Sequence, residues 1–233
     1  MAYRTELDEV PPGQVDQVIQ DFTDAGATQV TKTSQSDGTF TIVATFPDRP
    51  NPSPLPDPNQ PAPRLSLSWD NQTRRPWSAA LLTSIQNAMP KLALGNANSF
   101  LDGYDNLTPD LQLKFWGELV VAVAKFESSW NPHDIFHEPP PLSVDSIGLL
   151  QLSYEDQSAY NLEPLSRAQK SLEDPFINLR CGVAILATLV AKDRTVTSSL
   201  SGKYRGGAAY WSVLRAGHKV DQILSITRRN LGR

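Results

Sequence analysis

The sequence predicts a mainly α-helical protein that begins with a small α+β module. Three observations indicate this fold class. Apolar residues recur at three- and four-residue steps through most of residues 65–233, as they do on the buried faces of helices. Residues 1–47 combine one helical pattern with two alternating ones. Between these regions, residues 48–64 carry proline at every second or third position, which favours an extended spacer over helix or sheet.

The module at 1–47 is expected to be a helix followed by a β-hairpin. Its helix is indicated by apolar residues at helical spacing, with Gly26 as its stop: Val15, Val18, Ile19 and Phe22. Two strands are expected at 28–34 and 39–46, the second because apolar and polar residues alternate from Phe40. The sequence SDG between them suits a turn. A unit of this size is marginally stable alone, so it is expected to pack on another part of the chain.

Helices of the main region, 65–233, are predicted from their start signals. Thr108-Pro109-Asp110 supplies a capping hydroxyl, a proline in the first turn and an acid at the positive end, and its helix should run to about Asn131. Two other starts contain proline, at Arg75-Pro76 and Asp174-Pro175. Further helices are expected at about 206–216 and 219–230, and a long loop at 131–147.

Composition narrows the range of partners. The chain has 21 Lys and Arg against 25 Asp and Glu, and it lacks a long basic run, so a nucleic-acid partner is disfavoured. No apolar run of about 18 residues is apparent, so no membrane span is expected. The single cysteine, Cys181, lies in an apolar run and is expected to be a buried, inert thiol.

Glu127 is the first candidate for chemistry. It continues the apolar stripe of the helix that starts after Thr108, whose members are Trp116, Val120, Val123 and Ala124. Glu118 falls instead among lysines, and we expect it to be an ion-paired surface carboxylate. Apolar neighbours and the nearby negative helix end should both raise the pKa of Glu127. Such a carboxyl suits a general acid, although a buried glutamate held by hydrogen bonds would show the same pattern.

A second segment, GLLQ at 148–151, follows the expected loop. Gly148 suits close approach of the backbone to a ligand, and the Gln151 amide can form hydrogen bonds with sugar groups. Together with Glu127, these residues suggest a site that binds a glycan.

Four motifs now give a specific resemblance. ESSWNP at 127–132 resembles the ESxxNP signature of the soluble lytic transglycosylases, which are relatives of goose-type lysozyme. GLLQ at 148–151 is similar to their GLMQ, Asn178-Leu179 with Gly182 and Leu186 to their NI-x-x-G-x-x-x-L helix, and YRGG at 204–207 to their YNAG. The motifs occur in the family's order across about 110–215, and residues 1–64 lie outside the resemblance. Leu150 in place of methionine is a volume-conserving change, whereas Arg205 in place of asparagine alters one wall of the expected site.

The resemblance implies a lysozyme-like helical domain over 65–233 that cleaves the β-1,4 bond between N-acetylmuramic acid and N-acetylglucosamine in peptidoglycan. It implies that Glu127 acts first as acid and then as base, giving 1,6-anhydro products without a cofactor. It also implies that a set of five residues binds the substrate: Ser128, Gly148, Gln151, Asn178 and Tyr204.

Alternatives remain at this stage. A hydrolytic muramidase would need a second carboxylate to place water, for which Glu138 and Asp145 are the candidates. A chitin-cleaving enzyme or a non-catalytic glycan-binding envelope protein could keep the same scaffold. His133 and His137 are four residues apart, but flanking prolines make a regular helix there doubtful and no HExxH pattern occurs, so no metal is expected.

The substrate would place the protein's action in the bacterial cell envelope, in the periplasm or cell wall. The segment MAYRTELDEVPPG lacks the apolar core of a secretory signal, so delivery by another route is expected. Secretion machinery, a phage or an immunity protein are the partners that such delivery would suggest.

Overall fold

A computed structural model of the chain describes residues 3–24, 27–46, 65–138 and 144–232. Its contacts divide the chain into two compact units. Unit 1 comprises Met1–Pro52 and Ser199–Tyr204, and unit 2 comprises Ser53–Ser198 and Arg205–Arg233. The spacer predicted at 48–64 lies outside the described residues.

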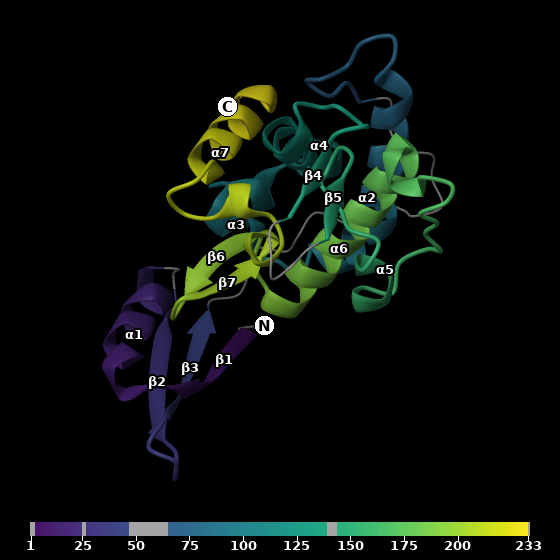
Figure 1. Cartoon of the computed structure of the whole chain (residues 1–233). Helices are drawn as coiled ribbons and strands as arrows, with labels where there is room; N and C mark the ends of the chain where they lie inside the picture. The colour runs from purple at the N-terminus through teal and green to yellow at the C-terminus, as the bar shows by residue number, and fades with distance from the viewer. Residues whose placement is uncertain (1–2, 25–26, 47–64, 139–143, 233) are drawn as a thin grey trace. The chain divides into compact units, whose positions relative to one another are not determined.

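Unit 1 is a three-stranded antiparallel sheet that packs against one helix (Figure 1). The predicted elements are present as α1 (Val15–Asp24), β2 (Gln29–Ser34) and β3 (Phe40–Phe46). A short 3-10 helix, η1 (Pro12–Gln14), precedes α1. The strand order is β1-β3-β2, so β3 lies in the centre. The core of the unit consists of buried apolar residues: Val10, Val15, Val18, Phe22, Ile42, Ala44 and Leu200.

The strand β1 (Tyr3–Val10) was missed by the sequence pattern. It pairs with β3 from Tyr3 opposite Phe46 to Val10 opposite Phe40, with an irregularity between Leu7 and Val10. Its sequence, YRTELDEV, contains charged residues that obscure the apolar alternation. Charged residues are common on edge strands, because they discourage pairing with other chains. The expected hairpin is therefore part of a larger, three-stranded sheet, and the expected helix packs against that sheet.

Unit 2 contains most of the helices of the chain (Figure 1). The longer helices are α2 (Arg75–Leu92), α4 (Pro109–Ser128), α6 (Pro175–Asp193) and α7 (Val220–Asn230). Short helices connect them: α3 (Ala97–Phe100), η2 (Tyr104–Asn106), α5 (Asp156–Ala159), η3 (Ser171–Glu173), η4 (Gly207–Ala209) and η5 (Ser212–Leu214). Two hairpins are also present. In unit 2, β4 (Ile135–His137) pairs with β5 (Asp145–Ile147). The second hairpin pairs β6 (Thr197–Leu200) with β7 (Lys203–Gly206), and its segment Ser199–Tyr204 belongs to unit 1.

The three predicted helix starts are present, and two of them have side-chain caps, whereas α2 begins without one. The Thr108 side chain accepts a hydrogen bond from Leu111 N at 3.4 Å. Asp174 Oδ1 accepts from Phe176 N at 2.7 Å and from Ile177 N at 3.2 Å. Each cap satisfies backbone donors that have no partner within the first turn, which is why these residues define where α4 and α6 begin.

Two predictions for connecting segments were wrong. The helix expected at 206–216 is replaced by the short helices η4 and η5. Gly206 has φ of +59°, and a Cβ there would lie 2.5 Å from Thr195 O, so the chain turns sharply where a regular helix was expected. The loop expected at 131–147 includes the strands β4 and β5, which pair in an antiparallel register from Ile135 opposite Ile147 to His137 opposite Asp145.

The core of unit 2 surrounds α4. This helix is buried along most of its length, with Phe115, Trp116 and Leu119 fully inaccessible. The helix α6 is also strongly apolar, and by length and composition alone it could cross a membrane, which the sequence pattern did not suggest. More than half of its apolar window is buried inside the fold, where it packs against α2 and carries the buried thiol of Cys181. Burial raises the pKa of that thiol to about 12, in agreement with the expected inert cysteine.

Glu118 is a correction to the sequence analysis, because it is buried and not on the surface. Its carboxylate accepts hydrogen bonds from Ser68 N at 2.8 Å, Ser68 Oγ at 2.6 Å and Asn230 Nδ2 at 2.8 Å. The prediction was wrong because the neighbouring lysines suggested a solvent-exposed face, whereas α4 is buried on the side where Glu118 lies. Glu118 thus connects α4 to the start of unit 2 and to the end of α7.

Glu118→Ala should lower the free energy of unfolding by about 3 kcal/mol, because Ser68 and Asn230 would lose a charged acceptor in a buried place. Urea denaturation monitored by circular dichroism measures this change. Glu163→Ala is the matched control: Glu163 pairs with Arg180 at the surface, and its loss should cost no more than about 1 kcal/mol. Equal effects of the two substitutions would contradict the structural role given to Glu118.

Candidate active site

Glu127 lies in the last turn of α4 and is half-buried. The helix ends just beyond it because Ser129 and Trp130 adopt left-handed backbone conformations, with φ of +53° and +65°. The buried Oε1 of Glu127 has no hydrogen-bond partner among the described residues. Glu127 therefore presents a carboxyl oxygen that the protein itself leaves unpaired.

The pKa of Glu127 is raised from an ordinary 4.5 to about 7. Burial is the largest cause, in agreement with the sequence prediction, because it disfavours the charged carboxylate. The negative charge of Glu138 raises the pKa further, and the positive charge of Arg215 opposes both effects. Near neutral pH the carboxyl is thus divided between its protonated and ionised forms, so it can both give and take a proton.

Glu138 follows β4 directly and was one of two candidates for a second carboxylate. Its backbone N donates to Val144 O at 2.9 Å, and its Oε1 accepts from Ser146 Oγ at 3.2 Å. The other candidate, Asp145, pairs with His137 instead, with 2.6 Å between Asp145 Oδ1 and His137 Nδ1. Of the two, only Glu138 has a charge that acts on Glu127.

Arg215 was missed by the sequence analysis. It follows η5, far from Glu127 in the chain, and its Nε donates to Ala208 O at 3.0 Å. Its influence on Glu127 depends on how the C-terminal segment packs against α4, and no local motif signals that packing. Ser146, which donates to Glu138 within the β4–β5 hairpin, was missed because that segment was expected to be a loop.

The segment GLLQ forms a tight turn whose backbone is held by Asn178 of α6. Asn178 is fully buried, and its Nδ2 donates to Ile147 O and to Leu172 O, both at 2.9 Å. Its Oδ1 accepts from Leu150 N at 3.0 Å. Both the nitrogen and the oxygen of the Asn178 amide are therefore bonded to backbone groups, so Asn178 holds the turn in place.

Ser128 and Gln151 also make internal hydrogen bonds. Ser128 Oγ donates to Leu149 O at 3.0 Å, which ties the end of α4 to the turn. Gln151 has φ of +50°, and its Nε2 donates to Gly148 O at 2.9 Å and to Asp134 O at 3.2 Å. Tyr204 lies in β7 and is 44% exposed, and it belongs to unit 1. Its position relative to Glu127 is therefore not assigned.

Comparison with known proteins identifies the family. The family model described as transglycosylase SLT domain matches residues 110–216. The structure of wild-type Bd0314 DslA, form 2, is 30% identical, with a TM-score of 0.64, and the match covers 72% of this chain and 97% of that one. The chain belongs to the transglycosylase SLT family. No curated protein sequence matches it.

Structures of two glutamate-to-glutamine variants of DslA are also similar to this chain. One is 29% identical with a TM-score of 0.64, covering 72% of this chain and 97% of that one. The other is 30% identical with a TM-score of 0.62, covering 69% and 93%. Membership of the SLT family agrees with the predicted lysozyme-like helical fold. It supports a transglycosylase-type activity on peptidoglycan, and hence action in the cell envelope.

The tryptophans of the SLT domain serve mainly its framework. Trp116 is fully buried, as predicted, and its Nε1 donates to Tyr104 Oη at 2.9 Å. Trp211 is buried too, and its Nε1 donates to Leu150 O at 2.9 Å. Trp130 is half-buried, with the cations of Arg74 and Lys125 placed over its ring. Trp130 Nε1 donates to Val121 O at 2.9 Å, so the indole N–H of each of the three is bonded within the protein.

The two histidines considered as metal ligands separate onto different partners. His133 pairs with Glu173 at 3.2 Å, whereas His137 pairs with Asp145. Among the described residues, no three His, Cys, Asp or Glu side chains form a group that could hold a metal ion.

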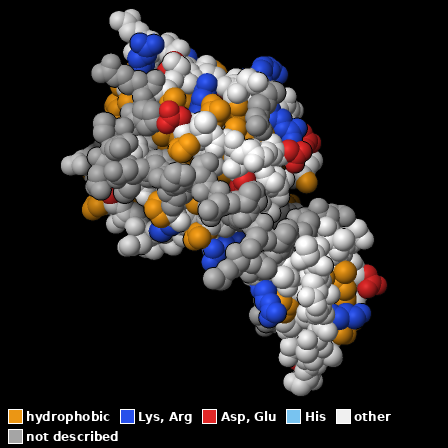
Figure 2. Space-filling model, turned by 180° about the vertical axis from the view of Figure 1, so that it is seen from behind, with side chains coloured by type: hydrophobic (Ala, Val, Ile, Leu, Met, Phe, Trp, Pro, Cys, Tyr) orange, Lys and Arg blue, Asp and Glu red, His pale blue; other side chains and the backbone are white. Residues whose placement is uncertain are grey.

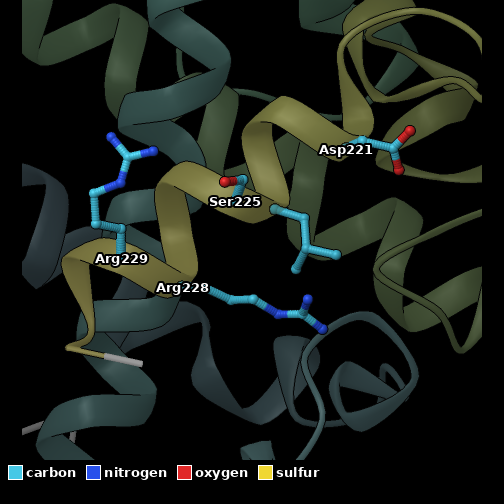
Figure 3. Close-up of a pocket in the computed structure, with 5 residues that line it drawn as sticks. Asp221, Ser225, Arg228 and Arg229 are labelled. Atoms are coloured by element: carbon cyan, nitrogen blue, oxygen red, sulfur yellow. The ribbon is translucent and has the colours of Figure 1, made fainter.

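A hollow of about 430 Å³ lies along α7, away from the predicted site residues (Figure 3). It is lined by Asp221, Leu224, Ser225, Arg228 and Arg229. Figure 3 shows Arg228 and Arg229 extending in different directions, so their guanidinium groups do not converge on one anion. On the face shown in Figure 2, basic, acidic and apolar side chains are interspersed, without the broad basic surface that nucleic-acid binding requires.

Gly148→Ala should destabilise the SLT domain by about 3 kcal/mol. Gly148 has φ of +77°, and a Cβ there would lie 2.4 Å from Leu172 O and 2.5 Å from Asn178 Nδ2. Gly217 has a similar φ of +78° with open space around it, so Gly217→Ala should cost only about 1 kcal/mol. Thermal denaturation of both variants compares them, and equal losses would contradict the tight packing of the turn.

Glu127→Gln should stabilise the protein at high pH. Because the folded pKa of about 7 exceeds the ordinary 4.5, the folded state holds this proton more tightly than the unfolded state. Stability of the wild type is therefore lost as pH rises from about 4.5 to about 7. At pH 8 the variant should be more stable by roughly 2 kcal/mol, and at pH 4 the two should be equal. A pH-independent difference in urea unfolding would show that Glu127 is not desolvated.

Proposed function

We propose that this SLT protein cleaves the β-1,4 bond between N-acetylmuramic acid and N-acetylglucosamine in peptidoglycan, with Glu127 as the acid. The observation that carries this proposal is a half-buried carboxyl with a pKa of about 7 and an unpaired oxygen. A carboxyl with an ordinary pKa would be almost fully ionised near neutral pH and could not protonate a glycosidic oxygen efficiently.

In the first step Glu127 transfers its proton to the oxygen between the two sugars, and the bond from that oxygen to the muramic acid C1 breaks. The positive charge that develops on this ring is shared with the substrate's own acetamido oxygen. Glu127, now a carboxylate, takes the proton from the 6-hydroxyl as that oxygen bonds to C1. The product is a 1,6-anhydro sugar, no water is consumed, and Glu127 is protonated again.

Glu138 and Arg215 adjust this cycle in opposite directions. The charge of Glu138 favours the protonated Glu127 that begins the reaction, whereas the charge of Arg215 favours the carboxylate that remains after the first transfer. An intermediate pKa suits a group that must serve as acid and base in succession.

The remaining predicted residues are proposed to shape the sugar site. Ser128, Gly148 and Asn178 hold the turn against α4 and α6, which fixes the backbone beside Glu127. Gln151 is proposed to contact the sugars itself. Catalysis is assigned to residues 65–233, and no activity is assigned to residues 1–47.

Hydrolysis is a second candidate outcome, and two observations favour it. Glu138 is a second carboxylate whose charge reaches Glu127, as a hydrolytic mechanism with a water-activating base requires. The glutamates replaced in the two DslA variants are eleven residues apart in that protein. Glu127 and Glu138 are also eleven residues apart. In this mechanism Glu127 remains the acid, and Glu138 takes a proton from the water that attacks C1.

Mass spectrometry of digested cell walls tests both outcomes. Purified peptidoglycan sacculi are treated with the wild type, and anhydro products should be lighter than hydrolytic ones by about 18 mass units, the mass of one water. Glu127→Gln should reduce the rate at least a hundredfold in either case, because no acid remains to protonate the leaving oxygen. Equal clearing of the sacculi by the wild type and Glu127→Gln would refute the catalytic role.

Glu138→Gln separates the two mechanisms. If the reaction is a transglycosylation, anhydro products should persist, and the loss of activity at high pH should begin at a lower pH because the pKa of Glu127 falls. If it is a hydrolysis, the hydrolytic products should be lost. Asp145→Asn is the matched control, since Asp145 lies on the same hairpin but pairs with His137. Digestion of chitooligosaccharides in parallel tests the chitin-cleaving alternative, and binding without cleavage would indicate a glycan-binding protein.

A further inference from the structure

The strands β4 and β5 form a short antiparallel hairpin (Figure 1). Its two faces carry side chains of different character. Phe136 lies directly opposite Ser146 in the register, so both side chains leave the same face. Ser146 Oγ donates to Glu138 Oε1, which places Glu138 on that face as well. The neighbouring residues of β4, Ile135 and His137, leave the opposite face, because side chains alternate along a strand.

The hairpin begins beside the turn that holds the end of α4: Asp134 O, just before β4, accepts from Gly148 N at 2.8 Å, and Ser128 Oγ, next to Glu127, donates to Leu149 O at 3.0 Å. The face with Phe136 also carries Glu138, and the charge of Glu138 acts on Glu127. Phe136 is two residues from Glu138 on the same side of the chain, so their Cα atoms are separated by roughly 7 Å along the strand direction. A glycan bound at Glu127 would therefore pass close to this ring.

Phe136 is itself unusual because it is 55% exposed, more than any other large apolar residue in the described parts of the chain. A phenylalanine ring that is open to water offers apolar surface that a bound apolar group can cover. The backbone register fixes where Phe136 lies on the hairpin, and the His137–Asp145 pair joins the two strands on the other face.

We propose that Phe136 is a sugar-binding platform, on which the apolar face of one sugar ring of the glycan strand packs next to the bond that Glu127 cleaves. This inference rests on the proposed function. A pyranose ring has a face of C–H groups edged by hydroxyls, and the surface around Phe136 is complementary to it. The aromatic ring receives the C–H face, while the Ser146 hydroxyl and the Glu138 carboxylate can bond the hydroxyls.

The chemistry of this face favours a sugar over a protein partner. A protein interface is centred on several adjoining apolar side chains that exclude water together. Among the described residues of the hairpin, one exposed ring shares its face with a hydroxyl and a carboxylate, and the other exposed apolar residue of β4, Ile135, leaves the opposite face. One ring with polar edges matches one sugar.

Substitution of Phe136 tests the platform through the kinetics of sacculus digestion. Phe136→Ala should raise KM about tenfold while kcat changes less than about twofold, because the ring contributes binding and takes no part in proton transfer. Phe136→Tyr should restore the KM of the wild type. Ile135→Ala is the matched control: Ile135 is 43% exposed on the same strand but on the other face, so its KM should not change.

Binding measured without turnover separates this inference from the proposed function. Glu127→Gln and Glu127→Gln combined with Phe136→Ala are each mixed with sacculi and sedimented, and the second should bind about tenfold more weakly. If the wild type leaves sacculi intact but this difference in binding appears, the platform stands and the cleavage proposal fails. If the wild type cleaves but Phe136→Ala matches it in KM and in sedimentation, or Ile135→Ala is impaired equally, the platform is refuted.

Discussion

The site depends on one buried amide. The side-chain amide of Asn178 in α6 forms hydrogen bonds with the backbone around the turn at Gly148–Leu150. This segment has no regular secondary structure that could supply partners for its backbone groups. Buried peptide groups without partners are costly, so the turn can exist inside the domain only because a side chain replaces the missing ladder. Ser128 and Trp211 complete the arrangement by donating to Leu149 O and Leu150 O. The end of α4, the turn and the C-terminal segment are consequently fixed to one another.

The raised pKa of Glu127 depends on this rigidity. A carboxyl whose surroundings could relax would draw in water and recover an ordinary pKa. Here the apolar neighbours are held in place, and the two charges that act on Glu127 are each tethered: Glu138 by Ser146, and Arg215 by Ala208 O. The pKa near 7 thus results from three fixed contributions, and a change at any one tether should alter it.

Much of this architecture could be predicted from the sequence, because the signals were local. Thr108 and Asp174 mark helix starts through bonds to residues two or three positions ahead, and the motif around Glu127 specifies a helix end. The features that were missed depend on residues distant in the chain. Glu118 looked exposed because its lysine neighbours are near in sequence, while Ser68 and Asn230, which bind it, are far away. Arg215 acts on the site through tertiary packing, which no periodicity reports, and Ser146 acts through a hairpin where a loop was expected.

The motifs that are similar to those of the SLT family therefore divide by physical role. Gly148 and Asn178 have structural roles. The glycine leaves the space that a side chain would fill, and the amide of Asn178 supports the turn through its hydrogen bonds. Glu127 is the opposite case, with a buried oxygen that no group in the described structure binds. A protein stabilises itself by satisfying its buried polar atoms, so an atom left unsatisfied within a framework this well bonded is a cost to the fold. A substrate oxygen carried to that position would remove the cost, which is the physical reason to place the reaction there.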